Sequence, residues 1–440
     1  MATEVAIGSS NSPAVGNYFV ANYPPFSAWT QGQVGAVLEA LSRKPRDNTE
    51  LGIYVHIPFC RKRCHFCYFK VYTDRGKDEI SSYVDALIRE VAAYSEKPAV
   101  VGRQATFLYL GGGTPSYLSV RHLRQLYSAL STGFDLTGLR EFTFEGEPGT
   151  LSPTKIEIIK EIGVTRLSIG VENFGDEILE LNGRAHDSQQ IYAAYAAAER
   201  AGFRRINIDL IAGMLGETDE NWRDSVAKAI ELSPASVTIY QMEIPHNTSL
   251  YAQINEKGAL AGIAGWDTKR RWLEYAFAEL ERAGYRVSSG YTLSRAVPDN
   301  EFVYTNSLWR GADLIGVGVS SFAHVSGIHY QNEHNLAPYL SRVQAGDLPI
   351  FRALETTPRE LMIREFILQM KLGKVSLGYF REKFGADPLD IFKEPLGDLV
   401  GRDLVTLSGD EMALSRSALL QVDSLLPAFF LPQHRDIRYS

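Results

Sequence analysis

This 440-residue chain places all three of its cysteines in one short run, Cys60-Arg-Lys-Arg-Cys64-His-Phe-Cys67. A run this short cannot form a disulfide framework, and no further cysteine occurs elsewhere. Three thiolates on one loop suit an iron–sulfur cube with one iron left open to a non-protein ligand. A zinc site completed by His65 and a chance cluster of buried thiols are the alternatives. No second pair of ligands follows, which favours the iron–sulfur interpretation over zinc.

The residues before this run extend the pattern. Gly52-Ile-Tyr-Val-His-Ile-Pro-Phe-Cys60 predicts a β-strand that runs directly into the cysteine loop. The stretch resembles the radical S-adenosylmethionine (SAM) superfamily, and its lead-in resembles the oxygen-independent coproporphyrinogen III oxidase-like (HemN-like) family. The resemblance implies a [4Fe-4S] cluster on Cys60, Cys64 and Cys67. It also implies SAM on the open iron and a 5′-deoxyadenosyl radical as the reactive species.

Composition and charge exclude several classes of protein. The net charge is −7, and acidic and basic residues are interspersed, so nothing indicates nucleic-acid or membrane-surface binding. The first residues lack the basic head and apolar stretch of a signal peptide, and no apolar run approaches the roughly 20 residues of a membrane span. Unpaired cysteines are typical of a reducing compartment. We therefore expect a cytoplasmic protein that contacts neither nucleic acid nor a membrane.

Apolar runs alternate with amphipathic stretches through the first part of the chain. The expected strands are Gly52–Ile57, Ala105–Leu110, Glu141–Glu145, Arg166–Gly170, Arg205–Ile211 and Ser236–Met242. The expected helices between them are Asp78–Ser95, Val120–Ser131, Thr154–Ile162, Ser188–Ala201 and Glu220–Leu232. Strands joined by crossover helices form parallel βαβ units. The prediction is an α/β fold, a partial (β/α)6 TIM-type radical SAM barrel with its chemistry at the carboxyl ends of the strands.

The predicted organisation has four parts: an N-terminal arm (1–48), the partial barrel (49–250), a barrel extension (251–354) and a C-terminal module (355–440). The aromatic, Pro-rich segment Gly16–Phe26 is expected to pack over the barrel mouth. In the extension we expect a helix at Thr268–Ala283, a strand at Tyr285–Tyr291 and a Gly-rich loop at Asp313–Ser321. The C-terminal module resembles the winged-helix-like module of the HemN-like family. Because it is not basic, we expect scaffolding or a substrate lid rather than DNA binding.

Glycine and acidic residues follow the second and third expected strands. The run Gly111-Gly112-Gly113-Thr114 lets backbone N–H groups approach a ligand, although such runs also make simple tight turns. By resemblance, Gly112, Gly113 and Thr114 contact the SAM amino group. Glu145 and Glu147 could serve general acid–base chemistry or a hard metal ion. By resemblance, Glu145 instead holds the SAM ribose, and Glu147 caps the turn.

Three further charged residues lie in or after the fourth and fifth expected strands. By resemblance, Glu172, Arg184 and Asp209 contact a second SAM molecule. Glu172 stands where the family usually has Gln; a carboxylate still accepts from ribose hydroxyls but adds charge and lacks a donor. Asp209 could alternatively cap its loop. The same resemblance gives the remaining expected SAM contacts: Tyr54, Phe66 and Met242. The catalytic residues are not identified, and His246 is more often structural than a proton donor.

Two departures from the family bear on the reaction. Coproporphyrinogen dehydrogenases typically carry a fourth cysteine two residues beyond the third, where this chain has Phe69. Heme chaperones carry a His-Asn-x-x-Tyr-Trp element, and the stretch Tyr304–Gly311 keeps Trp309 but lacks the His and the Tyr. The chain equally resembles a third branch of the family, the coproporphyrinogen-oxidase-like methyltransferases and cyclopropanases, and that resemblance implies C-methylation or a related C1 transfer to an sp2 carbon. The alternatives are a coproporphyrinogen III dehydrogenase that decarboxylates propionates, and a heme-binding chaperone.

The partners follow from the aromatic and basic residues. A flat, unsaturated or tetrapyrrole-like small molecule is the expected substrate, because the arm and the end of the cysteine loop carry several aromatic side chains. These are Tyr18, Phe19, Tyr23, Tyr68 and Phe69. The basic run Arg61–Arg63 favours an acidic electron donor such as flavodoxin or ferredoxin. A solvated loop explains the same run equally well.

Overall fold

The computed structural model describes residues 19–45, 48–244, 248–251 and 262–435. Tyr18 and His246 lie outside these residues. Within them, twelve strands form one sheet in the order β12-β11-β10-β9-β1-β2-β3-β4-β5-β6-β8-β7. These strands are β1 (Leu51–Ile57), β2 (Ala105–Gly112), β3 (Glu141–Gly146), β4 (Arg166–Glu172), β5 (Arg205–Ala212), β6 (Ser236–Gln241), β7 (Tyr285–Val287), β8 (Thr292–Arg295), β9 (Asp313–Val317), β10 (Phe322–Val325), β11 (Ile328–Asn332) and β12 (Ile350–Glu355).

The middle of this sheet is parallel. Each neighbouring pair in the series β9-β1-β2-β3-β4-β5-β6 runs in the same direction. Nearly every residue of β1 and β3 is buried, as expected for parallel strands covered on both faces. The predicted α/β fold with successive βαβ units is confirmed, and all six expected strands are present.

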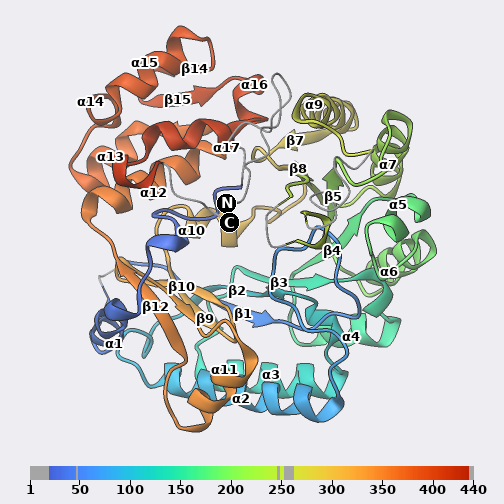
Figure 1. Cartoon of the computed structure of the whole chain (residues 1–440), viewed down its shortest axis with the longest axis vertical. Coiled ribbons are helices and arrows are strands. Elements are labelled where there is room, and N and C mark those ends of the chain that lie inside the picture. The colour runs from blue at the N-terminus through green and yellow to red at the C-terminus, as the bar shows by residue number, and fades with distance from the viewer. Residues whose placement is uncertain (1–18, 46–47, 245–247, 252–261, 436–440) are drawn as a thin grey trace, which may run out of the picture.

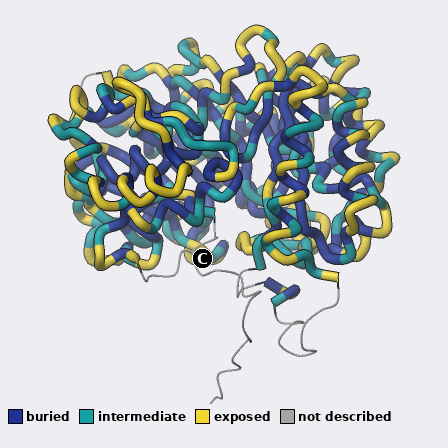
Figure 2. Tube along the Cα trace, turned by 90° about the horizontal axis from the view of Figure 1, so that it is seen from above, coloured by how far each residue is buried: buried dark blue, intermediate teal, exposed yellow. Residues whose placement is uncertain are grey.

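Helices surround the sheet and form the outer layer (Figure 1). They are α1 (Val34–Leu41), α2 (Lys77–Ser95), α3 (Val120–Gly133), α4 (Pro153–Glu161), α5 (Asp176–Leu181), α6 (Ser188–Arg200), α7 (Asp219–Leu232), α9 (Trp266–Arg282) and α11 (Leu336–Gln344), whereas α10 (Val303–Leu308) lies inside this layer. Local signals set their starts. The Ser119 hydroxyl accepts from the His122 amide at the start of α3, and Ser152 caps α4 in the same way. In Figure 2 the buried residues lie along the inner elements and the exposed residues at the periphery.

The chain after β12 forms a smaller unit with its own hydrophobic core. It contains α12 (Pro358–Met370), β13 (Lys374–Ser376), α13 (Leu377–Phe384), α14 (Pro388–Ile391), α15 (Lys393–Gly401), β14 (Val405–Ser408), β15 (Glu411–Leu414), α16 (Arg416–Leu419) and α17 (Val422–Leu425). The order β13-β15-β14 is antiparallel, and the helices agree with the expected winged-helix-like module. Val20 and Tyr23 of the N-terminal arm are buried in this second core. The arm therefore packs, as its aromatic composition predicted. The domain boundaries stay predictions.

One expectation for the barrel extension is wrong: Asp313–Val317 is not a loop but the strand β9, parallel to β1. Its Gly316 allows a close crossing, because a Cβ there would lie 2.5 Å from the Phe322 carbonyl oxygen. The strand expected at Tyr285–Tyr291 is present but shorter. It is β7 (Tyr285–Val287), and the Ser288 amide, which donates to the Thr292 carbonyl at 2.8 Å, closes the turn to β8.

Among the described residues, no helix combines the length and the apolar character needed to cross a membrane.

The crossing at Gly316 yields a stability prediction. Gly316→Ala should lower the free energy of unfolding by about 1–3 kcal/mol, because the new methyl meets backbone atoms that cannot move cheaply. Gly397→Ala in α15 is the matched control, since a Cβ there meets no atom within 4 Å. That change should stabilise by about 0.5–1 kcal/mol. Thermal unfolding of the metal-free protein, followed by circular dichroism, measures both. Equal midpoints for the two variants would contradict the close crossing.

Candidate active site

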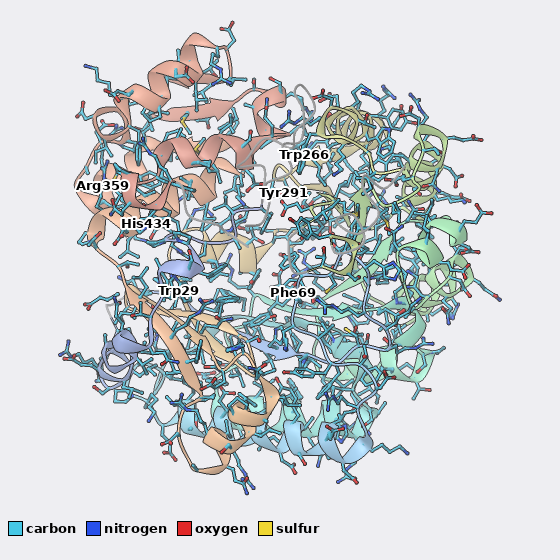
Figure 3. All side chains as sticks on the ribbon, viewed as in Figure 1. Trp29, Phe69, Trp266, Tyr291, Arg359 and His434 are labelled. Carbon is cyan, nitrogen blue, oxygen red and sulfur yellow. The ribbon has the colours of Figure 1, made fainter. Side chains whose placement is uncertain are left out.

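A cavity of about 600 Å³ lies at the carboxyl ends of the parallel strands. The cysteine loop, strands β2 to β6, α10, the N-terminal arm and the C-terminal module all contribute to its lining. Figure 3 places Phe69 of the cysteine loop and Tyr291 of the β7–β8 hairpin toward the middle of the ring of elements. Every residue predicted to hold the cluster or SAM lines this cavity, except Tyr54. The Tyr54 hydroxyl lies 2.9 Å from Nδ1 of His56, and its role as a SAM contact stays a prediction.

The cysteine loop is held close to the glycine turn that follows β2. The Gly113 amide donates to the Ile57 carbonyl at 2.8 Å. A Cβ on Gly113 would lie 3.0 Å from the Cys60 sulfur, so glycine is needed for this approach. The Thr114 hydroxyl donates to the Cys60 sulfur at 3.3 Å, and Arg184 Nη1 donates to the Cys64 sulfur at 3.1 Å. Hydrogen bonds to cysteine sulfurs are a recurrent feature of iron–sulfur sites.

The donor set fits an iron–sulfur cluster better than a single zinc ion. His65 Nδ1 lies 3.2 Å from the Leu181 carbonyl oxygen, and its ring rests against Gly183. Among the described residues, no three Cys, His, Asp or Glu side chains converge to hold one metal ion. A cubane separates its three cysteine ligands more widely than a single tetrahedral ion does. Burial raises the pKa of Cys60 to about 11, so loading of a metal group must displace protons there.

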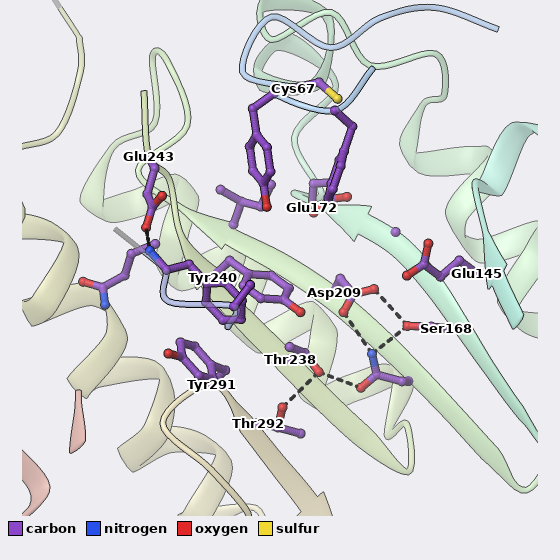
Figure 4. Close-up of a pocket in the computed structure, with 18 of the residues that line it drawn as sticks. Cys67, Glu145, Ser168, Glu172, Asp209, Thr238, Tyr240, Glu243, Tyr291 and Thr292 are labelled. Carbon is purple, nitrogen blue, oxygen red and sulfur yellow. Dashed lines mark hydrogen bonds between the residues drawn. The ribbon is translucent and has the colours of Figure 1, made fainter. Parts of the chain in front are cut away.

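Three carboxylates from successive strands face the cavity (Figure 4). Glu145, at the end of β3, accepts hydrogen bonds from the Tyr109 hydroxyl at 2.6 Å and the Gly112 amide at 3.0 Å. Glu172, at the end of β4, follows a shift in the β4–β5 register and has a φ of 65°. Such a backbone is uncommon for a residue other than glycine, and it often marks a functional site. Glu172 lies 3.5 Å from Arg184 Nη2.

Asp209, on β5, is the third carboxylate. It accepts hydrogen bonds from the Ser168 hydroxyl at 2.9 Å and from the Asn207 side-chain amide at 3.0 Å. Burial and then the charge of Glu172 raise the pKa of Asp209 to about 8. Burial also raises the pKa values of Glu145 and Glu172. These acids outnumber the adjacent cation Arg184, so a positively charged ligand would relieve their mutual repulsion.

Aromatic side chains form much of the remaining wall. Tyr68 and Phe69 extend from the cysteine loop with ring centroids 4.4 Å apart, and both are exposed. Tyr240 and Tyr291 stack with centroids 6.2 Å apart, and Phe19 of the arm packs edge-on against Tyr291. Flat apolar surfaces of this kind suit a planar ligand.

The arm and the C-terminal module close the cavity through contacts that the sequence did not reveal. The Phe19 amide donates to Glu243 at 2.5 Å, and the Val20 amide donates to Asp423 at 2.9 Å. The fully buried Lys371 pairs with Asp423 at 2.8 Å. No local motif marks these residues, because each pair joins distant segments.

The remaining predicted residues are placed as follows. Phe66 and Met242 line the cavity and pack in the same small apolar cluster. Glu147 accepts from the Gly149 amide at 3.1 Å, which confirms the predicted turn cap. Its other partner is Nδ1 of His186, also at 3.1 Å.

Comparisons with known proteins agree with this geometry. The family model described as the radical SAM superfamily matches residues 54–229. The heme chaperone HemW of Lactococcus lactis is 29% identical over 355 residues, which cover 80% of this chain and 90% of that protein. The oxygen-independent coproporphyrinogen III oxidase of Escherichia coli is 28% identical over 356 residues, 78% of this chain and 76% of that protein. The solved structure of coproporphyrinogen III oxidase (HemN) from Escherichia coli superposes with a TM-score of 0.82 at 25% identity and covers 93% of this chain and 96% of that one.

The cysteine loop yields a metal-content prediction. Cys64→Ala should remove most of the bound iron and sulfide after anaerobic reconstitution, because the cluster loses one of its three protein ligands. His65→Ala is the matched control and should keep them, since its ring contacts the Leu181 carbonyl. Chemical iron and sulfide assays with visible absorption measure both. Loss of one zinc ion per chain in both variants would instead establish a Cys3His site.

Proposed function

The chain belongs to the HemN-like family of the radical SAM superfamily, and we propose from this premise that it acts on a tetrapyrrole-like substrate held in the cavity. The observation that carries the proposal is a single cavity shared by the cysteine loop, three half-buried carboxylates and a set of aromatic walls. The cysteines suit the cluster, the carboxylates suit a cationic cofactor, and the aromatic walls suit a planar substrate.

The proposed division of roles follows the strand order. Cys60, Cys64 and Cys67 would hold the cluster, and Gly112, Gly113 and Glu145 would position the first SAM. When bound, the cluster and SAM together supply a 5′-deoxyadenosyl radical. The protein contributes position and seclusion. The stacked pair Tyr240–Tyr291 and the arm around Phe19 restrict access of water to the cavity.

A second SAM molecule is also part of the proposal. Glu172 and Asp209 are separate from Glu145, and both are half-buried carboxylates with raised pKa values. When all three acids are ionised, one SAM cation and Arg184 leave one negative charge unmatched, and a second SAM cation would match it. Glu172 replaces the usual Gln and accepts hydrogen bonds without donating any.

The substrate class rests on the relatives and on the walls of the cavity. One relative is named for coproporphyrinogen III oxidation and the other for heme delivery, and both names concern tetrapyrroles. Tyr68 and Phe69 on one segment, and Tyr240 and Tyr291 on others, offer planar surfaces to such a ring.

A second candidate function is C1 transfer to an sp2 carbon, in which the second SAM would donate the carbon. It is favoured by Phe69, which lines the cavity where coproporphyrinogen dehydrogenases carry a fourth cysteine. The relatives reported above are an oxidase and a chaperone, so they do not support methyl transfer. We therefore rank radical oxidation of a porphyrinogen side chain first.

Product analysis tests the proposal. The reconstituted protein is incubated anaerobically with SAM, dithionite and coproporphyrinogen III, and nucleosides and tetrapyrroles are analysed by mass spectrometry. We expect 5′-deoxyadenosine in proportion to a porphyrinogen that has lost carbon dioxide, and neither product with Cys64→Ala.

Other product patterns identify the alternatives. S-adenosylhomocysteine together with a tetrapyrrole that has gained carbon would establish C1 transfer. Stoichiometric heme binding, with transfer to an apo-acceptor and no SAM cleavage, would establish a chaperone. A porphyrinogen that neither changes nor stimulates SAM cleavage would contradict a tetrapyrrole enzyme.

Asp209 yields a pH prediction. In the ligand-free protein its pKa is about 8, so near neutral pH the acid is largely protonated and must release a proton to face a cation. The affinity of the second SAM molecule, which would contact Asp209, should therefore rise with pH. The rise should be up to tenfold per pH unit below the pKa of Asp209 and should level off above about pH 9. Asp209→Asn should remove this rise and weaken binding at high pH.

Anaerobic equilibrium dialysis of SAM against the reconstituted protein measures this effect. Asp224→Asn, an exposed acid on α7, is the control and should keep the wild-type profile. An unchanged pH profile in Asp209→Asn would show that the second SAM, if bound, does not contact this carboxylate.

A further inference from the structure

Arg364 of α12 is a buried cation that lines the cavity, and the described part of the chain gives it no ion pair with an acid. We propose that Arg364 binds a carboxylate of the substrate and thereby selects a planar molecule with acidic side chains. This inference rests on the proposed function, because it names the group that the tetrapyrrole-like substrate presents to the C-terminal module.

The contacts of Arg364 involve neutral acceptors. It is 5% exposed, and it lines the cavity. Its Nε donates to the Asn22 side-chain oxygen at 2.6 Å, and its Nη1 donates to the Leu308 carbonyl at 3.1 Å. Among the described residues, no carboxylate lies within ion-pair distance of Arg364, and Nη2 has no hydrogen bond. One arm of the guanidinium is therefore available to the cavity.

The neighbouring acid does not neutralise this cation. Glu365, the next residue of α12, pairs with Lys383 at 2.8 Å and accepts from the Tyr379 hydroxyl at 2.5 Å. Burial lowers the pKa of Arg364, in agreement with a charge whose surroundings only partly offset its desolvation. A buried guanidinium without an anion is costly, and its planar fork matches a carboxylate.

The surroundings of Arg364 define the rest of the ligand. Tyr304, Leu308, Trp309 and Leu368 line the same cavity and present aromatic or apolar surface. The site therefore suits a carboxylate attached to a flat apolar body. Tyr304, Leu308 and Trp309 belong to the stretch Tyr304–Gly311, which lacks the His and the Tyr that heme chaperones carry there. Recognition through Arg364 would give this stretch a role as the wall beside the acidic group.

Binding of two porphyrins tests the inference. Coproporphyrin III, a stable fluorescent analogue with free carboxylates, is compared with its tetramethyl ester, which lacks the anionic groups. Fluorescence titration is performed on wild type, Arg364→Gln, Arg364→Lys and Arg352→Gln. Arg352 is the matched control, because it also contacts the arm, through the Phe26 carbonyl at 2.8 Å, but does not line the cavity.

We expect Arg364→Gln to weaken coproporphyrin III binding by about 10- to 100-fold, the range of one charge-assisted hydrogen-bonded contact. Binding of the ester should change less than about twofold. Arg364→Lys should recover part of the loss, because it keeps the charge but not the fork. Arg352→Gln should bind both porphyrins as the wild type does.

Three other results would overturn the inference. Equal weakening of acid and ester would show that Arg364 only maintains the shape of the cavity. Unchanged binding of the acid by Arg364→Gln would place carboxylate recognition elsewhere. If the wild-type protein bound neither porphyrin, the tetrapyrrole function itself would fail, and this role with it. If Arg364→Gln does not fold, Arg364→Lys tests the inference instead. A larger loss of affinity for coproporphyrin III than for its tetramethyl ester would support it, and equal losses would overturn it.

Discussion

The hydrogen bond from the Gly113 amide to the Ile57 carbonyl is the contact on which the site depends. It joins the end of β1 to the turn after β2 at 2.8 Å, in the same register that pairs Ile57 with Gly112. The cysteine loop leaves β1 at this point, so its position relative to the sheet is fixed before any cofactor binds. A side chain at residue 113 would meet the Cys60 sulfur and the backbone of Ile57 and Pro58. The glycine turn and the cysteine loop therefore act as one unit, although they are about 50 residues apart in the sequence.

Parallel strand pairing explains why the acidic residues gather opposite this unit. The strands β3, β4 and β5 are parallel neighbours, so Glu145 and Glu172 near two strand ends and Asp209 within β5 are brought together by topology rather than by sequence proximity. The resulting negative charge is only partly offset by Arg184, which also donates to the Cys64 sulfur. A fold that concentrates half-buried carboxylates in this way favours cationic ligands over neutral ones of the same shape.

The parts of this arrangement that the sequence predicted are those with local signals. Strand and helix periodicity, helix caps such as Ser119 and the spacing of the cysteines all act over a few residues. The strand β9 was missed because glycine is typical of loops. Gly316 instead lies within the strand, where the absence of a side chain lets the backbone of Phe322 approach closely. The contact between Phe19 and Glu243 joins residues 224 positions apart, and no local pattern encodes it. Arg364 was missed for a different reason: arginines are mostly exposed, whereas α12 is buried along most of its length.

The buried cations of the chain differ in whether an acidic side chain pairs with them. This difference separates structural from functional roles. Arg166 donates to Glu141 at 2.9 Å, and Lys371 pairs with Asp423 at 2.8 Å, so each is matched within the fold. Removing either partner would leave an uncompensated buried charge, which is a stability effect. Within the described ranges of the chain, Arg364 donates only to the neutral oxygens of Asn22 and Leu308 while it lines the cavity. Because the arm and α10 hold it in place without neutralising it, its charge is best accounted for by an anionic group supplied by the ligand.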